Sequence, residues 1–193
     1  MKRFATSVLA VVIGMTAISA AHAQADIAFK GAGGKLSFVF PDAEGIDNAL
    51  GAGVIADLGT IIPELGLQAT LDFWSKSEDA GLAEYTFRDI AIGARTTYTF
   101  PLENNDIRPF VAGGLAIHFV KSEYDGPEID AGPLGTYSND YDDSDTKIGL
   151  DLVGGSNFAV SENVDILGEA MFRIVNDVTQ FVISGGVIYW FGG

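Results

Sequence analysis

The sequence has no cysteine, few basic side chains and, after its first 25 residues, no long apolar run. The absence of cysteine excludes a disulfide scaffold, a thiol nucleophile, a thiolate metal site and a lipid-anchored N-terminal cysteine. Only 11 Lys and Arg residues stand against 26 Asp and Glu, so the chain lacks the positive surface that neutralises nucleic-acid phosphates. No later apolar stretch approaches the ~20 residues of a membrane-spanning helix. Thiol chemistry, nucleic-acid binding and helical membrane insertion are therefore not expected.

The first 25 residues have the three-part layout of a secretory signal. Lys2 and Arg3 give a positive start, an apolar run covers residues 8–20, and small residues follow it. We expect 1–25 to be removed, which leaves 26–193 as one domain. Losing Lys2 and Arg3 leaves 9 of the 11 basic side chains against 26 acidic ones, a formal net charge of −17. Export places the mature chain beyond the inner membrane.

Beyond the signal, apolar and polar side chains alternate with a period of two, which is typical of strands with one apolar face. In 107–121, for example, Leu115, Ile117 and Phe119 share one face and His118 lies on the other. Glycine, with 24 residues, is too frequent for helices. Eight segments follow the pattern: 34–40, 50–58, 65–74, 88–100, 107–121, 147–158, 164–175 and 180–191.

The connections between these segments alternate in length. Those after the second, fourth and sixth segments are short, whereas 41–49, 75–85 and 122–146 are longer and acidic. Short turns at one end and longer loops at the other are typical of transmembrane barrels. Closing an antiparallel meander also removes its exposed edges. We therefore predict an all-β fold, an eight-stranded antiparallel up-and-down transmembrane β-barrel.

The polar face of the segments indicates which way the side chains point. It carries mostly Gly, Ala, Ser and Thr, whereas a water-facing surface is rich in long charged side chains. Eight strands leave an interior that side chains just fill, and charges placed there must be paired. We predict a lumen charge network of Asp72, Arg95, Arg108, Asp151, Glu169 and Arg173. Lys35, Asp57 and Asp89 lie on the same face.

Aromatic side chains on the apolar face fall into two groups with aliphatic and small residues between them. Two aromatic belts are typical of a barrel that crosses a bilayer. The alternative is a soluble barrel whose apolar face points inward and holds an apolar ligand. The predicted belt at the loop end contains Phe38, Phe73, Phe119, Phe172 and Phe181. The predicted belt at the turn end contains Tyr98, Phe100, Phe158, Tyr189 and Phe191.

Three stretches carry a family resemblance: IRPFVAGGLAIHFV at 107–120, SNFAVSENVDILGEAMFRI at 156–174 and FVISGGVIYWF at 181–191. Over essentially all of the mature chain the sequence resembles small outer-membrane β-barrels of the OmpA-like, OmpX-like and opacity-protein type. The resemblance implies eight antiparallel strands, both termini in the periplasm, and loops at the surface of a diderm bacterium. It also implies insertion by the barrel-assembly machinery. One departure is that two glycines follow the terminal aromatic, Phe191.

His118 is the first candidate for chemistry, because it is the only histidine of the mature chain. It lies near the outer end of its strand, where lipid-modifying barrel enzymes keep their chemistry. Such an enzyme needs a nucleophile and a base within hydrogen-bond reach. No serine of matching parity is nearby, so we expect a structural hydrogen bond.

The acidic loop 122–145 is the second candidate. It has no basic residue, and its three tyrosines suit it to recognition of an extracellular ligand. Its last stretch holds Asp140, Asp142, Asp143 and Asp145, and hard divalent cations take carboxylate oxygens. The central glycine and distal glutamate of a calcium loop are missing, so we expect a hydrated surface loop without a defined metal site.

The leading hypothesis is a monomeric outer-membrane barrel with a structural or surface-interaction role, without cofactor or catalysis. Three alternatives stay open: a barrel-embedded lipid-modifying hydrolase, a narrow channel for small solutes, and a soluble barrel that binds an apolar ligand. The expected partners are the lipid bilayer, the assembly machinery and a ligand of the acidic loop. Everything depends first on whether the apolar face points outward.

Overall fold

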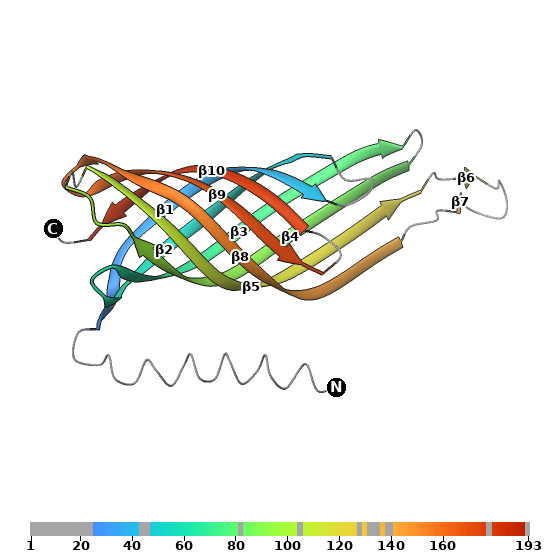
Figure 1. Ribbon diagram of the computed structural model, residues 1–193. Helices are drawn as coiled ribbons and strands as arrows, with labels where there is room; N and C mark the ends of the chain where they lie inside the picture. The colour runs from blue at the N-terminus through green and yellow to red at the C-terminus, as the bar shows by residue number, and fades with distance from the viewer. Residues whose placement is uncertain are drawn as a thin grey trace, which may run out of the picture.

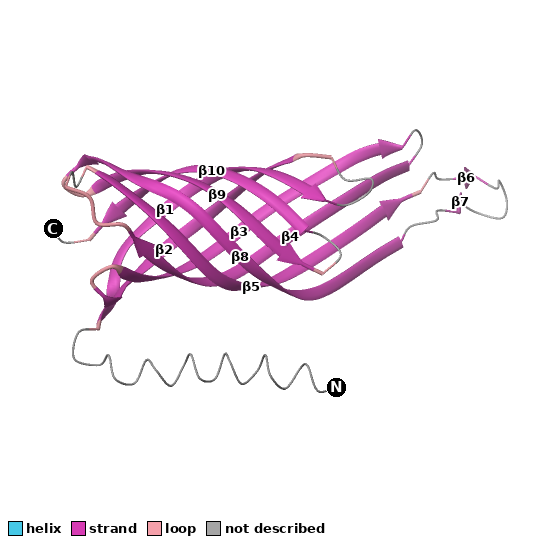
Figure 2. Cartoon of the chain, viewed as in Figure 1, coloured by secondary structure: helices cyan, strands magenta, loops and turns pink. Residues whose placement is uncertain are grey.

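The computed structural model describes residues 25–42, 47–80, 83–103, 106–126, 129–130, 136–137, 141–176 and 179–191. These residues form strands joined by turns (Figure 2). In the described ranges no helix is long and apolar enough to cross a membrane. The predicted signal peptide, apart from its last residue, and the two C-terminal glycines lie outside the described residues.

Eight long strands and one short hairpin make up the described chain (Figure 1). The strands are β1 Asp26–Asp42, β2 Ala49–Ile62, β3 Leu65–Ala80, β4 Ala83–Thr99, β5 Ile107–Asp125, β6 Ile129–Asp130, β7 Thr136–Tyr137, β8 Tyr141–Ser161, β9 Val164–Val175 and β10 Thr179–Trp190. The long strands close into a ring in the order β1-β10-β9-β8-β5-β4-β3-β2, and β6 pairs only with β7. Every neighbouring pair is antiparallel. The predicted fold class is therefore confirmed.

The barrel has two different ends. One end, which we call the terminal end, holds the start of β1, the finish of β10 and the turns β2–β3, β4–β5 and β8–β9. The opposite end, the loop end, holds the connections β1–β2, β3–β4, β5–β8 and β9–β10 (Figure 1).

At the loop end one half of the ring is taller than the other. β2 pairs with β3 only as far as Gly51 and Trp74, and β9 pairs with β8 only from Val175 and Gly149. Beyond these points β3, β4, β5 and β8 continue to pair with one another and stand out from the ring (Figure 1). We call this four-stranded extension the protruding sheet. It consists of residues 75–80, 83–88, 120–125 and 141–145.

The protruding sheet corrects two of the predicted loops. Residues 75–85 are almost entirely strand, since β3 runs to Ala80 and β4 begins at Ala83. The predicted loop 122–146 is also strand at both of its ends, which leaves 126–140 as the connection. Alternation missed these extensions because polar side chains occur on both faces of the protruding sheet, although Phe87 and Val120 near its base are buried.

Apolar side chains of the ring point outward and ionic ones inward. Ile92, Leu115 and Leu152 are 54%, 59% and 49% exposed, whereas Arg95 and Glu169 are each 4% exposed. So large an apolar exterior is stable only against hydrocarbon. The predicted outward direction of the apolar face is confirmed, and the alternative of a soluble barrel with an apolar interior is wrong.

The ten aromatic side chains of the two predicted belts all lie on the exterior, with exposed fractions between 40% and 56%. At the loop end Phe40 joins them, with its ring centroid 6.1 Å from that of Phe181. At the terminal end Tyr98 contacts Phe100 edge-to-face at 5.2 Å. Their position at the two membrane interfaces stays a prediction.

The barrel wall is irregular at the terminal end. β1 and β2 lose register between Ile27 and Gly31, and β2 loses register with β3 after Asp57. Gly59 has a φ of 87° there, in the left-handed region that favours glycine. A Cβ on Gly59 would lie 2.0 Å from the carbonyl oxygen of Asp26. The bend therefore requires glycine at this position.

We expect Gly59→Ala to lower the free energy of unfolding by about 1–3 kcal/mol, because it adds backbone strain and a steric clash. Urea unfolding in lipid vesicles measures the change. Gly154→Ala is the matched control, since a Cβ at that outward-facing glycine meets no atom within 4 Å. Equal losses in both variants would contradict the requirement for glycine at position 59.

Candidate functional site

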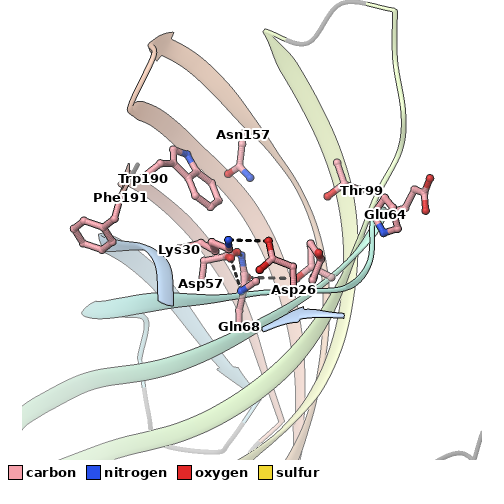
Figure 3. A pocket seen from close by; sticks show the side chains of 14 residues that line it. Asp26, Lys30, Asp57, Glu64, Gln68, Thr99, Asn157, Trp190 and Phe191 are labelled. Carbon is pink, nitrogen blue, oxygen red and sulfur yellow. Dashed lines mark hydrogen bonds and ion pairs between the residues drawn. The ribbon is translucent and has the colours of Figure 1, made fainter. Parts of the chain in front are cut away.

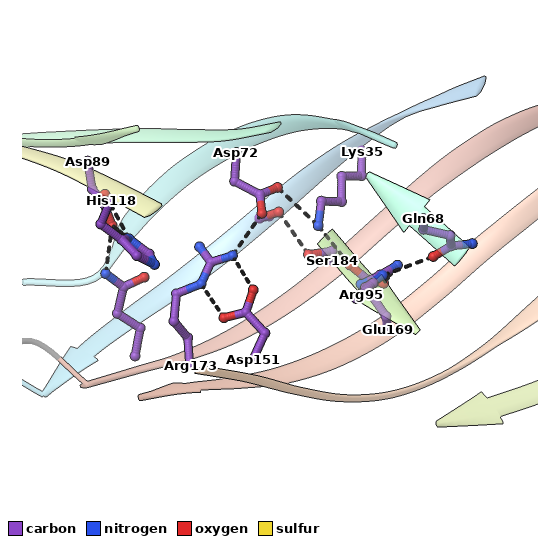
Figure 4. Close-up of polar contacts among 12 residues, drawn as sticks. Lys35, Gln68, Asp72, Asp89, Arg95, His118, Asp151, Glu169, Arg173 and Ser184 are labelled. Atoms are coloured by element: carbon purple, nitrogen blue, oxygen red, sulfur yellow. Dashed lines mark hydrogen bonds and ion pairs between the residues drawn. The ribbon is translucent and has the colours of Figure 1, made fainter. Parts of the chain in front are cut away.

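Six ionic side chains from five strands form one connected network across the lumen (Figure 4). Three are cations and three are anions, so the network is formally neutral. Each is at most 9% exposed. Because buried charges are stable only when paired, the mutual contacts of these residues account for their presence in the lumen. They are Lys35, Asp72, Arg95, Asp151, Glu169 and Arg173.

Glu169 joins two of the cations. Its Oε1 accepts a hydrogen bond from Lys35 Nζ at 2.8 Å, and its Oε2 accepts one from Arg95 Nη2 at 2.8 Å. Arg95 Nε also donates to Gln68 Oε1 at 2.9 Å. Gln68 Nε2 then donates to Asp57 Oδ2 at 3.3 Å. This half of the network therefore reaches from the middle of the lumen to the terminal end.

Arg173 organises the other half. Its Nε and Nη2 donate to the two carboxylate oxygens of Asp151 at 2.8 and 2.9 Å, a bidentate arrangement that fixes the guanidinium plane. Nη2 also lies 3.0 Å from Asp72 Oδ2. The other oxygen of Asp72 is 3.0 Å from Lys35 Nζ. Asp72 thus connects the two halves.

A glycine in the wall makes room for this connection. A Cβ on Gly53 would lie 2.3 Å from Asp72 Oδ1 and 3.0 Å from Lys35 Cε. The missing side chain is therefore what lets the Asp72–Lys35 ion pair lie against β2. Composition alone could not distinguish this glycine from the outward-facing ones.

Five of the six predicted network residues lie in the observed network, and Arg108 does not. Arg108 lies at the terminal end, where its guanidinium pairs with Asp165. The same carboxylate accepts a hydrogen bond from Trp190 Nε1 at 2.7 Å, and Arg108 lies 5.8 Å from the centroid of the Trp190 ring. Lys35 takes the place that the prediction gave to Arg108. Sequence reasoning missed Asp165, although it shares the lumen-facing parity of Glu169.

His118 is fully buried beside a carboxylate. Its Nδ1 lies 3.0 Å from both oxygens of Asp89, and Gln180 Nε2 donates to the same carboxylate at 3.0 Å. Within the described part of the chain, His118 Nε2 has no hydrogen-bond partner. It faces Gly149, where a Cβ would lie 2.7 Å away. The pair resembles the base and orienting group of a hydrolase but lacks a described nucleophile at Nε2.

We expect His118→Ala to leave the lipid A composition of the host cell unchanged. Mass spectrometry of extracted lipid A from cells that express either form measures this. The control is a strain that lacks the protein. A lipid species present only with the wild-type protein would support the hydrolase alternative.

Apolar side chains close the lumen on both sides of the ionic residues. Toward the loop end the rings of Trp74 and Phe87 stack, with centroids 5.1 Å apart. Toward the terminal end Phe110, Leu167 and Ile188 are between 2% and 4% exposed. All five belong to the buried hydrophobic cluster. The prediction of a lumen lined by small and ionic residues missed this cluster.

The acidic residues proposed as weak metal candidates do not form a site in the described chain. Asp140 lies outside the described residues, and the other three lie on strand β8. Asp142 pairs with Lys121 at 3.0 Å, and hydrogen bonds to Glu123 and Asp142 raise the pKa of Lys121. Successive strand residues point to opposite faces, so Asp142 points away from Asp143 and Asp145 and the three carboxylates do not converge. In the part of the chain that is described, no group of three or more His, Cys, Asp or Glu is arranged to hold a metal.

A hollow of about 320 Å³ opens at the terminal end (Figure 3). Its polar lining includes the ion pair of Lys30 with Asp26, at 2.7 Å, and the Asp57 carboxylate. Trp190 lies on another side of the hollow. Gln68 lines it too, so the hollow meets the end of the ionic network.

Comparison with solved structures finds the same fold in known outer-membrane proteins. Neisserial surface protein A has 20% sequence identity and a TM-score of 0.62, and the match covers 84% of this chain and 97% of that one. Ail, the attachment invasion locus protein of Yersinia pestis, has 13% identity and a TM-score of 0.58, over 86% of this chain and 100% of that one. A major outer membrane protein of Thermus thermophilus has 12% identity and a TM-score of 0.55, over 84% and 99%. At these identities the likeness shows the fold alone.

No curated protein sequence matches the chain. The family model of the outer membrane protein beta-barrel domain, in contrast, matches residues 8–191, which is nearly the whole sequence. That match agrees with the closed eight-stranded ring and its apolar exterior. The chain belongs to the outer-membrane β-barrel family, whose proteins reside in the outer membrane of diderm bacteria.

Proposed function

We propose that this protein is a non-catalytic surface-interaction barrel, with its loop end outside the cell, both termini in the periplasm, and the protruding sheet as the part that meets partners. The observation that best supports this proposal is that β3, β4, β5 and β8 continue to pair beyond the rest of the ring. A sheet that only anchored the barrel would end with the membrane band.

The exterior of the protruding sheet supports its position in water. Below it, Ile90, Ile117 and Phe119 are 41%, 47% and 46% exposed and form part of the apolar band. Above this band, within the protruding sheet, Arg88 and Lys121 both pair with Glu123, at 3.1 and 2.5 Å. The change from apolar to ionic side chains along the same strands indicates where the strands leave the bilayer.

The names of two structural neighbours support the same role. One is a surface protein and the other an attachment protein. Ail has also been solved with a heparin analogue, sucrose octasulfate. The acidic loop end of the present chain disfavours such a polyanion, because like charges repel. We therefore extend the surface role to this chain, but not the ligand.

The channel alternative is less well supported. Eight strands leave little bore, and the stacked rings of Trp74 and Phe87 fill it at the loop end. We expect no stepwise conductance when the refolded protein is added to a planar bilayer. Reproducible single-channel steps would favour the channel instead.

The absence of cysteine allows a direct test of orientation. Ser144→Cys places a thiol on an exposed strand of the protruding sheet, and Glu162→Cys places one on the exposed turn after β8, at the terminal end. A membrane-impermeant maleimide should label only Ser144→Cys on intact cells and both variants after lysis. Labelling of Glu162→Cys on intact cells would contradict the proposed orientation.

The interaction role is tested by trimming the protruding sheet. Removing residues 77–86 and 123–142, and joining each cut with Asn-Gly, keeps the ring and replaces the extension by two tight hairpins. Cells that display the wild-type barrel should be retained on protein-coated surfaces more than cells that display the trimmed one. Equal retention, with both forms inserted and heat-modifiable on a gel, would contradict the interaction role.

A further inference from the structure

Asp57 differs from the other carboxylates that point into the lumen of the described ring. It accepts hydrogen bonds from two neutral groups, the backbone N–H of Gly59 at 3.0 Å and the side-chain amide of Gln68 at 3.3 Å. Among the described residues no basic side chain forms an ion pair with it, because Lys30 pairs with Asp26 instead. The other lumen carboxylates each lie beside a basic side chain: Asp72, Asp89, Asp151, Asp165 and Glu169.

Asp57 faces the hollow of about 320 Å³ at the terminal end (Figure 3). The lining of this hollow holds the three carboxylates of Asp26, Asp57 and Glu64. It holds one basic side chain, Lys30, so its formal charge is 1 − 3 = −2. The volume lies at the lower end of the range for ligand sites. The hollow therefore admits a small molecule and favours a cation.

The wall opposite Asp57 supplies a second hydrogen-bond acceptor. Asp57 lies on β2 and Asn157 on β8, and three strands separate β2 from β8 in either direction around the ring. Asn157 lines the same hollow, and its amide points into it (Figure 3). Its Oδ1 is buried and has no hydrogen-bond partner among the described residues. An occupant that satisfies both walls must therefore donate hydrogen bonds at both of its ends.

The charge and the two acceptors select the class of ligand. An anion is repelled by a lining of net charge −2. A neutral polyol can donate to both acceptors but leaves the Asp57 carboxylate without a counter-ion. A primary ammonium group carries a full positive charge and three donors. A short aliphatic diamine has one such group at each end, which matches the charge of the lining, and its methylene chain can lie against Trp190, another residue of the lining.

We propose that the hollow at the terminal end binds a short aliphatic diamine, with one ammonium group on Asp57 and the other donating to Asn157 Oδ1. The site goes beyond the surface-interaction role, since it lies at the end of the barrel opposite the protruding sheet. In the orientation proposed above it opens to the periplasm. Its ligand supplies the counter-ion that the described chain does not give to Asp57.

The test is isothermal titration calorimetry of the intact barrel with putrescine, the diamine of butane. The barrel is held in nanodiscs of phosphatidylcholine, which has no net charge, and empty nanodiscs give the background. Butylamine, with one ammonium group, and butanediol, with none, are the matched ligands. We expect butylamine to bind about tenfold more weakly than putrescine, and butanediol to give no measurable heat. Equal binding of putrescine and butanediol would overturn the proposal.

Two protein variants test the two ends of the site. Asp57→Asn keeps the shape but removes the charge, and Asn157→Leu removes the acceptor on the opposite wall. Each should weaken putrescine binding by about tenfold. Glu162→Gln is the control, because it removes a carboxylate at the same end of the barrel that does not line the hollow, and it should bind like the wild type.

Heat-modifiable migration on a gel shows which variants fold, and either Asp57→Asn or Asn157→Leu suffices for the test. Wild-type affinity in a folded variant of either kind, or an equal loss in Glu162→Gln, would overturn the proposed site. Absence of putrescine binding to the wild type would overturn it as well. Neither result affects the surface-interaction role, which is tested separately by trimming the protruding sheet.

Discussion

Replacing Glu169 with glutamine is expected to lower the free energy of unfolding by about 3–5 kcal/mol. The carboxylate is the shared partner of Lys35 and Arg95, at 2.8 Å from each. Glutamine keeps the shape but leaves Arg95 without an anionic partner in a closed lumen and leaves Lys35 with Asp72 alone. Breaking a buried ion pair from one side costs more than the pair itself contributes, because the remaining charge stays desolvated.

Urea unfolding in lipid vesicles measures this loss, with the fluorescence of the two tryptophans as the signal. Glu162→Gln serves as the control, since Glu162 lies exposed in a turn and its change should cost less than about 0.5 kcal/mol. A loss below about 1 kcal/mol in Glu169→Gln would mean that water reaches the network and that the lumen is open.

Leu115→Arg is expected to lower the free energy of unfolding by about 2–4 kcal/mol, the cost of a basic side chain facing lipid near the bilayer midplane. Leu115 is 59% exposed and lies in the aliphatic band between the two groups of aromatic residues. In a water-soluble barrel the same exposed position would accept arginine at almost no cost. The result therefore separates a hydrocarbon environment from water.

The comparison variant is Ser144→Arg, on the outer face of the protruding sheet opposite Lys121. It should lower stability by less than about 1 kcal/mol, because that face meets water and the like-charge pair with Lys121 is only weakly destabilising there. Vesicle unfolding of both variants, together with heat-modifiable migration on a gel, gives the measurement. Comparable losses at the two positions would place both in the same solvent and remove the boundary inferred between band and sheet.

Alternation in the sequence was sufficient to predict the ring and the direction of its side chains. Leu115 and Ile117 point outward and His118 inward because successive strand residues point to opposite faces. The same rule failed beyond Trp74 and before Lys147, where β3 and β8 continue past their neighbours β2 and β9 and carry polar side chains on both faces. A strand shows alternation only where one of its faces is apolar and the other polar. These polar extensions therefore carry no such pattern.

The ion pairs were only partly predictable. Parity places Arg95, Arg108 and Glu169 in the lumen, but which of them meet depends on the register and tilt of strands that are distant in sequence. Arg108 is the second residue of β5, at the terminal end, and pairs with Asp165, the second residue of β9. Lys35 reaches the centre because Gly53 leaves room beside it. The sequence of one strand does not show that a glycine on the neighbouring strand leaves room for a side chain.

The ionic network ties together parts of the chain that meet only in the finished ring. Lys35 and Glu169 are 134 residues apart, and Asp72 and Arg173 are 101 apart. A half-zipped sheet in hydrocarbon would therefore keep Glu169 apart from Lys35 and Arg95, and Arg173 apart from Asp72, at a high cost in free energy. Ring closure and ion pairing must consequently occur in one cooperative step. Insertion of this chain is then all-or-none. A slipped register that leaves even one of the six ions without a partner is disfavoured by the same free energy that stabilises the closed native barrel.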